Sequence, residues 1–215
     1  MTFLQLVNAV MRRLREEQAT TINESDYSVL ISDFVNDAKR MVEDAWDWKS
    51  LRSDFNVTTV AGTSTYTLTG SGNRLEILHV YDTTNNVELR RLSLADVNKY
   101  KVQTDDTNGT VMGYTVSHVD SNGDVVIKLH STPDSVISLQ VKAVLRPSEL
   151  ENDSDRLLVP SAPVIQYAYA FALRERGETG GQGATEQSAF ARQELTNAIA
   201  LDAALSPDEL IWDTV

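Results

Sequence analysis

The first fifty residues carry apolar side chains at helical spacing. Within residues 2–17, apolar residues recur on one face three or four positions apart: Phe3, Leu6, Val10 and Leu14. Thr2 and Gln5 have the spacing of a capping box, in which each side chain accepts a hydrogen bond from a backbone N–H at the start of a helix. Asn23 or Ser25 is then a suitable N-cap for a second helix of about 23 residues. This pattern predicts two amphipathic helices.

Two tryptophans follow the apolar stripe of the second helix. On a helical projection, the apolar positions from Tyr27 to Ala45 fill an arc of roughly 160°, and Trp46 and Trp48 fall on its opposite edges. A stripe this wide is typical of a helix that contacts more than one neighbour. The two side chains either seal the rim of the chain's own core or contact another subunit. We expect both at a subunit or domain interface.

The pattern changes from helical to alternating near Asp54. Six or seven short strands are predicted, separated by Gly, Asn, Asp and Pro, over 55–60, 65–69, 75–82, 87–92, 114–119, 124–130 and 136–145. From Ile137 to Leu145, apolar residues alternate with polar ones, which indicates one buried face. A short helix capped by Ser93 is expected over 93–101, and Asn122-Gly123 is typical of a hairpin turn. The middle of the chain therefore predicts an antiparallel β domain.

Two more helices are predicted after the strands. Residues 164–173, VIQYAYAFAL, hold nine apolar residues and one Gln, so this helix must be covered on nearly all sides. It belongs at the centre of a bundle or between subunits, and we expect Tyr169 and Phe171 at a subunit or domain interface. A glycine-rich loop, 177–183, then leads to a last helix over about 184–204.

The order of these elements predicts an α+β fold. Helices from both ends of the sequence form a bundle, and an antiparallel β domain is inserted between them. The expected parts are N-terminal helices over 1–52, the β domain over 53–146, C-terminal helices over 147–204 and a tail over 205–215. A chain of 215 residues accommodates either one domain or two closely packed subdomains.

The tail holds large apolar residues that a short segment cannot bury by itself. Leu210, Ile211 and Trp212 follow Ser206 and Glu209, which have capping-box spacing. The tail either lies on its own domain or docks on a partner, where an aromatic side chain can anchor in a pocket.

Charge and composition exclude several functions. The chain has 31 acidic and 19 basic residues and a formal net charge of -12, which argues against stable nucleic-acid binding. It has no Cys, and its three His residues lack ligand spacing, so we expect no metal, no cofactor and no thiol nucleophile. The sequence contains no phosphate loop, dinucleotide fingerprint or nucleophile elbow. We therefore expect no enzyme. No apolar run approaches the roughly 18 residues of a membrane span.

Three stretches resemble a known family. They are LVNAVMRRLRE over 6–16, DYSVLISDFVNDAKRMVEDAWDWKSLR over 26–52 and TTVAGTSTYTLTGSGNRLEILHVYD over 58–82. They are similar to the head-to-tail adaptor, or connector, proteins of tailed bacteriophages. That group includes tail tubular protein A and the portal-bound adaptors of short-tailed phages. The order of predicted elements agrees along nearly the whole chain.

The resemblance implies a structural virion protein, assembled in the host cytoplasm, that forms a ring of usually twelve copies at the portal-tail junction. Such a ring binds the portal protein, extends the channel for double-stranded DNA during ejection, and offers a platform to the next tail component, a nozzle or tail tube. The resemblance also assigns Leu210, Ile211 and Trp212 to portal docking. Excess acid suits a DNA channel because carboxylates repel phosphate, but it serves solubility equally well. A different tail-completion or decoration protein, or a virion-associated hydrolase, remains an alternative.

Overall fold

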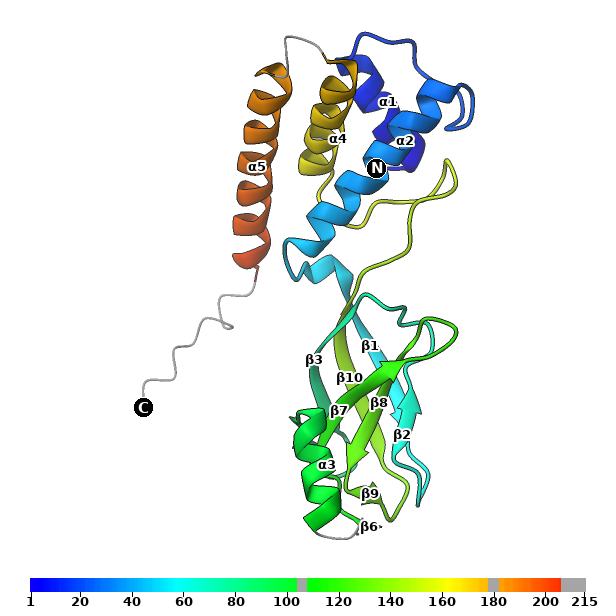
Figure 1. Ribbon diagram of the computed structural model, residues 1–215, viewed down its shortest axis with the longest axis vertical. Coiled ribbons are helices and arrows are strands. Elements are labelled where there is room, and N and C mark those ends of the chain that lie inside the picture. Colours follow the sequence, from blue (N-terminus) through cyan, green and yellow to red (C-terminus); the bar gives the residue numbers. More distant parts are fainter. Residues whose placement is uncertain (104–107, 178–181, 206–215) are drawn as a thin grey trace. The chain divides into compact units, whose positions relative to one another are not determined.

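The computed structural model describes residues 1–103, 108–177 and 182–205 (Figure 1). The chain divides into a helical unit, formed by Met1–Ser50 with Ser148–Val215, and a β unit, formed by Leu51–Pro147. Both ends of the sequence thus contribute helices that flank an inserted β region. The predicted α+β fold class is confirmed.

Helix α1, Phe3–Arg13, begins as the sequence predicts. The Gln5 N–H donates to the Thr2 hydroxyl at 3.3 Å, and the Thr2 N–H donates to Gln5 Oε1 at 3.0 Å. The helix ends earlier than predicted, because Leu14 is its C-cap and Arg15 adopts a φ of 59°. Its apolar face is fully buried: Phe3, Leu6, Val7 and Val10 are at most 1% exposed.

Helix α2, Asp26–Asp44, starts after Ser25, one of the two predicted caps, whose hydroxyl accepts a hydrogen bond from the N–H of Ser28. The helix ends at Asp44, and a short 3-10 turn, η1, Lys49–Leu51, follows. Trp46 and Trp48 therefore lie beyond the helix, and the prediction that they edge a helical stripe is wrong. No Gly or Pro marks this helix end in the sequence, so the apolar pattern runs past it.

Helix α4, Ser161–Arg176, lies between α5, Gln182–Ala203, and the pair α1 and α2 (Figure 1). It packs against all three helices. Its buried residues cover most of its circumference, among them Val164, Ile165, Ala168 and Ala170, and residues on the remaining side, such as Tyr169, are half-buried. The prediction of a central helix covered on nearly all sides is confirmed.

The β unit consists of two four-stranded sheets and a two-stranded ribbon. The first sheet has the order β1 (Arg52–Thr58), β10 (Ser138–Leu145), β3 (Leu75–Asp82) and β4 (Val87–Glu88). The second has the order β2 (Thr65–Thr67), β8 (Val125–His130), β7 (Gly113–Val119) and β5 (Arg90–Arg91). The ribbon joins β6 (Asn108–Gly109) and β9 (Thr132–Pro133). The long pairs are antiparallel, but β5 pairs with β7, and β6 with β9, in parallel. The predicted antiparallel domain is therefore a mixed one.

Apolar residues from both sheets form one core. Val80 and Val141 come from the first sheet and Ile127 and Leu129 from the second, and each is at most 2% exposed. Strand β10 shows the predicted alternation until a bulge after Lys142, beyond which two successive residues are buried. The chain therefore closes a sandwich of its own within the β unit.

Two local predictions in the β unit are confirmed. The short helix is α3, Leu94–Gln103, and the Ser93 hydroxyl accepts a hydrogen bond from the N–H of Asp96. The Asn122-Gly123 turn joins β7 to β8, and Gly123 adopts a φ of 87°, which glycine tolerates without strain.

Candidate assembly surfaces

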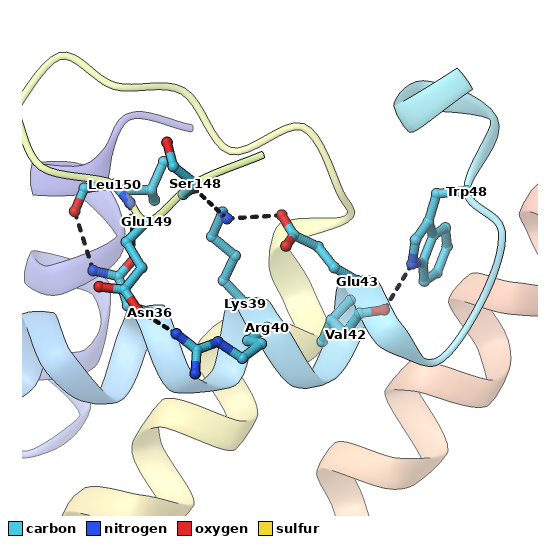
Figure 2. Close-up of polar contacts among 9 residues, drawn as sticks. All are labelled: Asn36, Lys39, Arg40, Val42, Glu43, Trp48, Ser148, Glu149 and Leu150. Carbon is cyan, nitrogen blue, oxygen red and sulfur yellow. Dashed lines mark hydrogen bonds and ion pairs between the residues drawn. The ribbon is translucent and has the colours of Figure 1, made fainter. Parts of the chain in front are cut away.

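One face of α2 holds the chain segment that returns from the β unit. Lys39 Nζ donates a hydrogen bond to the backbone oxygen of Ser148 at 2.8 Å and lies 2.9 Å from Glu43 Oε1 (Figure 2). The side chains of Lys39 and Glu43 are 3% and 0% exposed. Because water and salt do not reach this ion pair, removal of one partner leaves a buried charge without its counterion.

Two further side chains on α2 extend this contact. Asn36 forms a pair of hydrogen bonds with the backbone of Leu150, donating from Nδ2 at 3.1 Å and accepting at Oδ1 at 3.0 Å. Arg40 forms an ion pair with Glu149 at the exposed edge (Figure 2). We refer to Asn36, Lys39, Arg40 and Glu43 as the α2 polar cluster. It fixes residues 148–150 against α2, since all four side chains share one side of the helix.

The two tryptophans have different environments. Trp48 is fully buried, and its indole N–H donates to the backbone oxygen of Val42 at 2.7 Å, which closes the end of α2 (Figure 2). Trp46 is 37% exposed, and its indole N–H donates to Asp202 Oδ2 at 3.0 Å. Lys49 also contacts Asp202. Trp46 and Lys49 therefore attach the segment after α2 to the end of α5.

The aromatic residues of α4 lie partly inside the helical unit. The ring of Phe171 meets Phe34 of α2 edge to face, with centroids 6.2 Å apart, and lies 6.4 Å from the ring of Tyr167. Tyr169 is half-buried. The structure does not bring Trp46, Trp48, Tyr169 and Phe171 together into one patch, and their role at a subunit interface stays a prediction. Leu210, Ile211 and Trp212 lie outside the described residues.

One flank of helix α5 is left uncovered by the described residues of the chain. Ala184 and Ala191 are buried on the side toward α4, where small side chains allow a close approach. On the outer side, large apolar residues are exposed along the helix and at its end: Phe190 by 48%, Leu201 by 74% and Leu205 by 72%. Exposed apolar surface of this kind is typical of a protein interaction site.

Acidic residues are divided unequally between the units. The helical unit has 21 acidic and 10 basic residues, whereas the β unit has 10 and 9. Four exposed aspartates follow one line along α2: Asp26, Asp33, Asp37 and Asp44. The negative charge of the chain thus belongs almost entirely to the helical unit.

Two turns are closed by exposed carboxylates. Asp124, after the β7–β8 turn, accepts hydrogen bonds from the N–H groups of Gly70 and Gly72, both at 3.0 Å, and these bonds hold its pKa below the usual range. In the helical unit, Asp155 accepts from the N–H groups of Asn152 and Glu151, both at 2.8 Å, and its pKa is lowered in the same way. Each carboxylate stabilises a turn in its ionised form.

Within residues 1–103, 108–177 and 182–205, no group of three or more His, Asp or Glu side chains could hold a metal ion. Over the same residues, no helix is both long enough and apolar enough to cross a membrane.

The α2 polar cluster escaped the sequence interpretation. Lys39 and Glu43 have the spacing of a helical ion pair, which is ordinarily a solvated feature. Their burial depends on Ser148, 109 residues beyond Lys39. A local pattern holds no signal for a partner that far along the chain.

A family model described as SU10 adaptor protein matches residues 1–209 of the chain. The match covers both units and all of the described residues. No curated protein matches the chain.

Proposed function

Because the chain belongs to the SU10 adaptor protein family, a family of bacteriophage structural adaptors, we propose that it forms a ring between the portal protein and the tail of the virion. The ring has twelve copies, extends the DNA channel and offers a platform to the next tail component, a nozzle or tail tube. Double-stranded DNA passes through it during ejection. We propose that the ring is assembled in the host cytoplasm. We propose also that the virion belongs to the short-tailed class.

The observation that carries this proposal is the family match over residues 1–209. It agrees with the surfaces of the helical unit. The outer flank of α5 exposes Phe190, Leu201 and Leu205, and a ring supplies the same neighbour to each of its copies. Trp46, Tyr169 and Phe171, which keep part of their surface exposed, are the residues we assign to the contacts of the helical unit in the ring, whereas Trp48 is fully buried within one copy.

The charge of the helical unit supports the channel role. A protein that grips DNA gains affinity by releasing counterions from the phosphates it neutralises. A unit with 21 acidic and 10 basic residues gains nothing in this way and lets DNA slide past. The line of aspartates along α2 supplies such a surface.

We further propose that residues 206–215 dock on the portal through Leu210, Ile211 and Trp212. The three are adjacent large apolar residues, and a buried aromatic anchor commonly dominates the binding energy of an interface.

Negative-stain images of the chain mixed with its cognate portal test the proposal. We expect an added ring on the portal in most particles. A chain that ends at Leu205 is expected to keep its circular dichroism spectrum and leave the portal bare, whereas Thr214→Ala, in the same segment, should add the ring normally. A portal that stays bare with the full chain contradicts the ring, and an added ring with the shortened chain contradicts the docking role of the tail.

A further inference from the structure

A hollow of about 460 Å³ lies on the β unit, where the chain crosses from one sheet to the other. Ile77, Leu89 and Tyr114 form its apolar floor, and His79, Arg90 and Arg91 stand at its rim. We refer to these six residues as the β3-edge pocket. The floor is rigid because Leu89 and Tyr114 belong to the core of the sandwich and are 3% and 2% exposed.

The pocket lies beside an open strand edge. Strand β10 pairs with one side of β3 along its length, but β4 pairs with the other side only at Tyr81 and Asp82. One more hydrogen bond joins the Leu89 N–H to the backbone oxygen of Val80 at 2.8 Å. From Leu75 to His79, no strand in the described part of the chain pairs with this second side. An extended peptide can add to such an edge as a further strand and place alternate side chains in an adjacent pocket.

The rim carries positive charge that the described residues do not neutralise. No carboxylate in residues 1–103, 108–177 and 182–205 forms an ion pair with Arg90 or Arg91. The one nearby acid, Glu88, lies 2.7 Å from His79 Nδ1. Two arginines that no carboxylate of the described residues pairs with, beside an apolar floor, fit a ligand that is both acidic and apolar.

The backbone holds both arginines at the pocket. Gly113 of β7 lets the backbone of Arg90 lie close to it, since a Cβ at residue 113 would lie 2.7 Å from the backbone oxygen of Arg90. The Leu92 N–H donates to the backbone oxygen of Tyr114 at 2.8 Å, which fixes the far side of β5. Burial raises the pKa of the Tyr114 hydroxyl, and the positive charge of Arg91 opposes part of that rise, so the two groups are close.

We propose that the β3-edge pocket binds residues 208–213 of a second copy of this chain. That segment reads Asp-Glu-Leu-Ile-Trp-Asp: three large apolar residues flanked by three acids, with no basic residue. Added to β3 as a strand, it turns Leu210 and Trp212 to one side, toward the floor, because side chains alternate along a strand. The acids on either side then lie near Arg90 and Arg91.

We assign the tail to the pocket of a second copy, and this step rests on the ring proposed above. The tail and the pocket are different surfaces of one chain, so their contact joins copies head to tail, and such contacts between identical copies occur in rings and in open filaments. The pocket and the portal compete for Trp212. The pocket contact therefore belongs to copies that have not yet met the portal, and it covers a segment that would otherwise promote aggregation.

The absence of Cys from the chain makes a direct test simple. One full-length preparation carries Thr214→Cys, next to the docking segment, and the other carries Glu88→Cys, at the rim of the pocket. The two are mixed without portal and treated with a short bismaleimide. We expect a cross-linked pair of one copy of each, and a peptide of residues 206–215 should compete with it.

Charge reversal supplies the specific control. Arg90→Glu together with Arg91→Glu in the Glu88→Cys chain should lower the yield of the cross-link about tenfold, since two charge-assisted contacts are lost. Lys128→Glu is the matched control, because Lys128 alternates with the buried residues of β8 and faces away from the pocket. It should leave the yield unchanged. Melting curves show that each variant is folded.

Three outcomes overturn the inference. The first is no cross-link between folded copies. The second is equal sensitivity to the charge reversal and to Lys128→Glu. The third is docking within one copy: a further variant that carries both Thr214→Cys and Glu88→Cys cross-links within itself, at a yield independent of concentration, and does so more than the mixed single-cysteine chains. Added portal separates this inference from the proposed function: the cross-link should fall while the portal gains a ring. A cross-link without any ring on the portal contradicts the function alone, and a ring without a cross-link contradicts the pocket alone.

Discussion

The two units of this protein solve the same problem, the burial of polar groups, by different means. The β unit is one continuous stretch of chain, and its buried carboxylate, Asp82, is satisfied locally by the N–H groups of Thr84 and Asn85. The helical unit joins two distant stretches, and its buried ion pair, Lys39 with Glu43, is completed by Ser148 from the far stretch. The buried ion pair of the helical unit therefore depends on a distant stretch of the chain, whereas the buried carboxylate of the β unit does not.

Charge follows the same division. The β unit is almost neutral, whereas the helical unit has a large acidic surplus and exposes the apolar flank of α5. Mutual repulsion of like charges opposes compactness, so the unit to which we assign the ring contacts is also the one that its own charge destabilises more. Amide hydrogen exchange, which reports each unit separately, can test how independent the two are.

The largest expected effect comes from breaking the buried ion pair. Lys39→Met removes the ammonium group beside the buried Glu43 carboxylate and should destabilise the helical unit by about 3–5 kcal/mol. Exchange protection in the β unit should not change. The double variant Lys39→Met with Glu43→Leu should recover much of the loss, because no charge then remains buried. Equal loss in the single and double variants would show that the ion pair is not the cause.

Truncation of the buried tryptophan tests the end of α2. Trp48→Ala removes a fully buried side chain and its hydrogen bond to Val42 and should cost the helical unit about 3–5 kcal/mol. Trp46→Ala, two residues away, should cost about 1–2 kcal/mol, since Trp46 is partly exposed and loses mainly its bond to Asp202. Chemical denaturation followed by amide hydrogen exchange measures both losses of stability. Similar losses of stability for Trp48→Ala and Trp46→Ala would contradict the finding that Trp48 is buried and Trp46 partly exposed.

A substitution in the β unit should leave the helical unit intact. Gly113→Ala places a methyl group 2.7 Å from the backbone oxygen of Arg90 and 2.9 Å from Leu92 Cδ1. We expect a loss of about 1–3 kcal/mol, confined to the β unit, from overpacking. Gly109→Ala is the matched control, since a Cβ there meets nothing within 4 Å. Loss of protection in α4 after Gly113→Ala would show that the units are not independent.

Acid should destabilise both units weakly and by the same mechanism, the protonation of a carboxylate that closes a turn. Asp124 and Asp155 have folded-state pKa values below their usual range, so each contributes stability above about pH 4, the usual value, and loses it as pH falls through that value toward the lowered one. Asp124→Asn should reduce the loss between pH 5 and pH 3 in the β unit only, and Asp155→Asn in the helical unit only. Exchange or melting measured over this pH range separates the two.

Local signals predicted most of the fold. The capping box at Thr2, the N-cap at Ser25, the Asn122-Gly123 turn and the alternation along β10 each act within a few residues, and each element forms where its signal lies. Local signals predicted the ends of the helices less well. The end of α2 at Asp44 has no stop residue, so the prediction that both tryptophans lie on the helix was wrong.

The surfaces depend on contacts that no local pattern contains. The α2 polar cluster needs residues 148–150, and the β3-edge pocket combines β3, the crossing between β4 and β5, and β7. In the sequence Arg90 and Arg91 are ordinary strand residues. They lie at the pocket because β5 pairs with β7 in parallel, and a strand of only two residues has no sequence pattern that predicts this pairing.

The most direct test of the central claim is the mass of the complex between this chain and its cognate portal, measured by native mass spectrometry or mass photometry. We predict that saturating chain adds about one copy per portal subunit, twelve on a twelve-fold portal, in a single step that lacks stable partial rings, because each copy completes a neighbour's interface. A portal whose mass does not change, or that gains one or two copies at random, would contradict the adaptor ring.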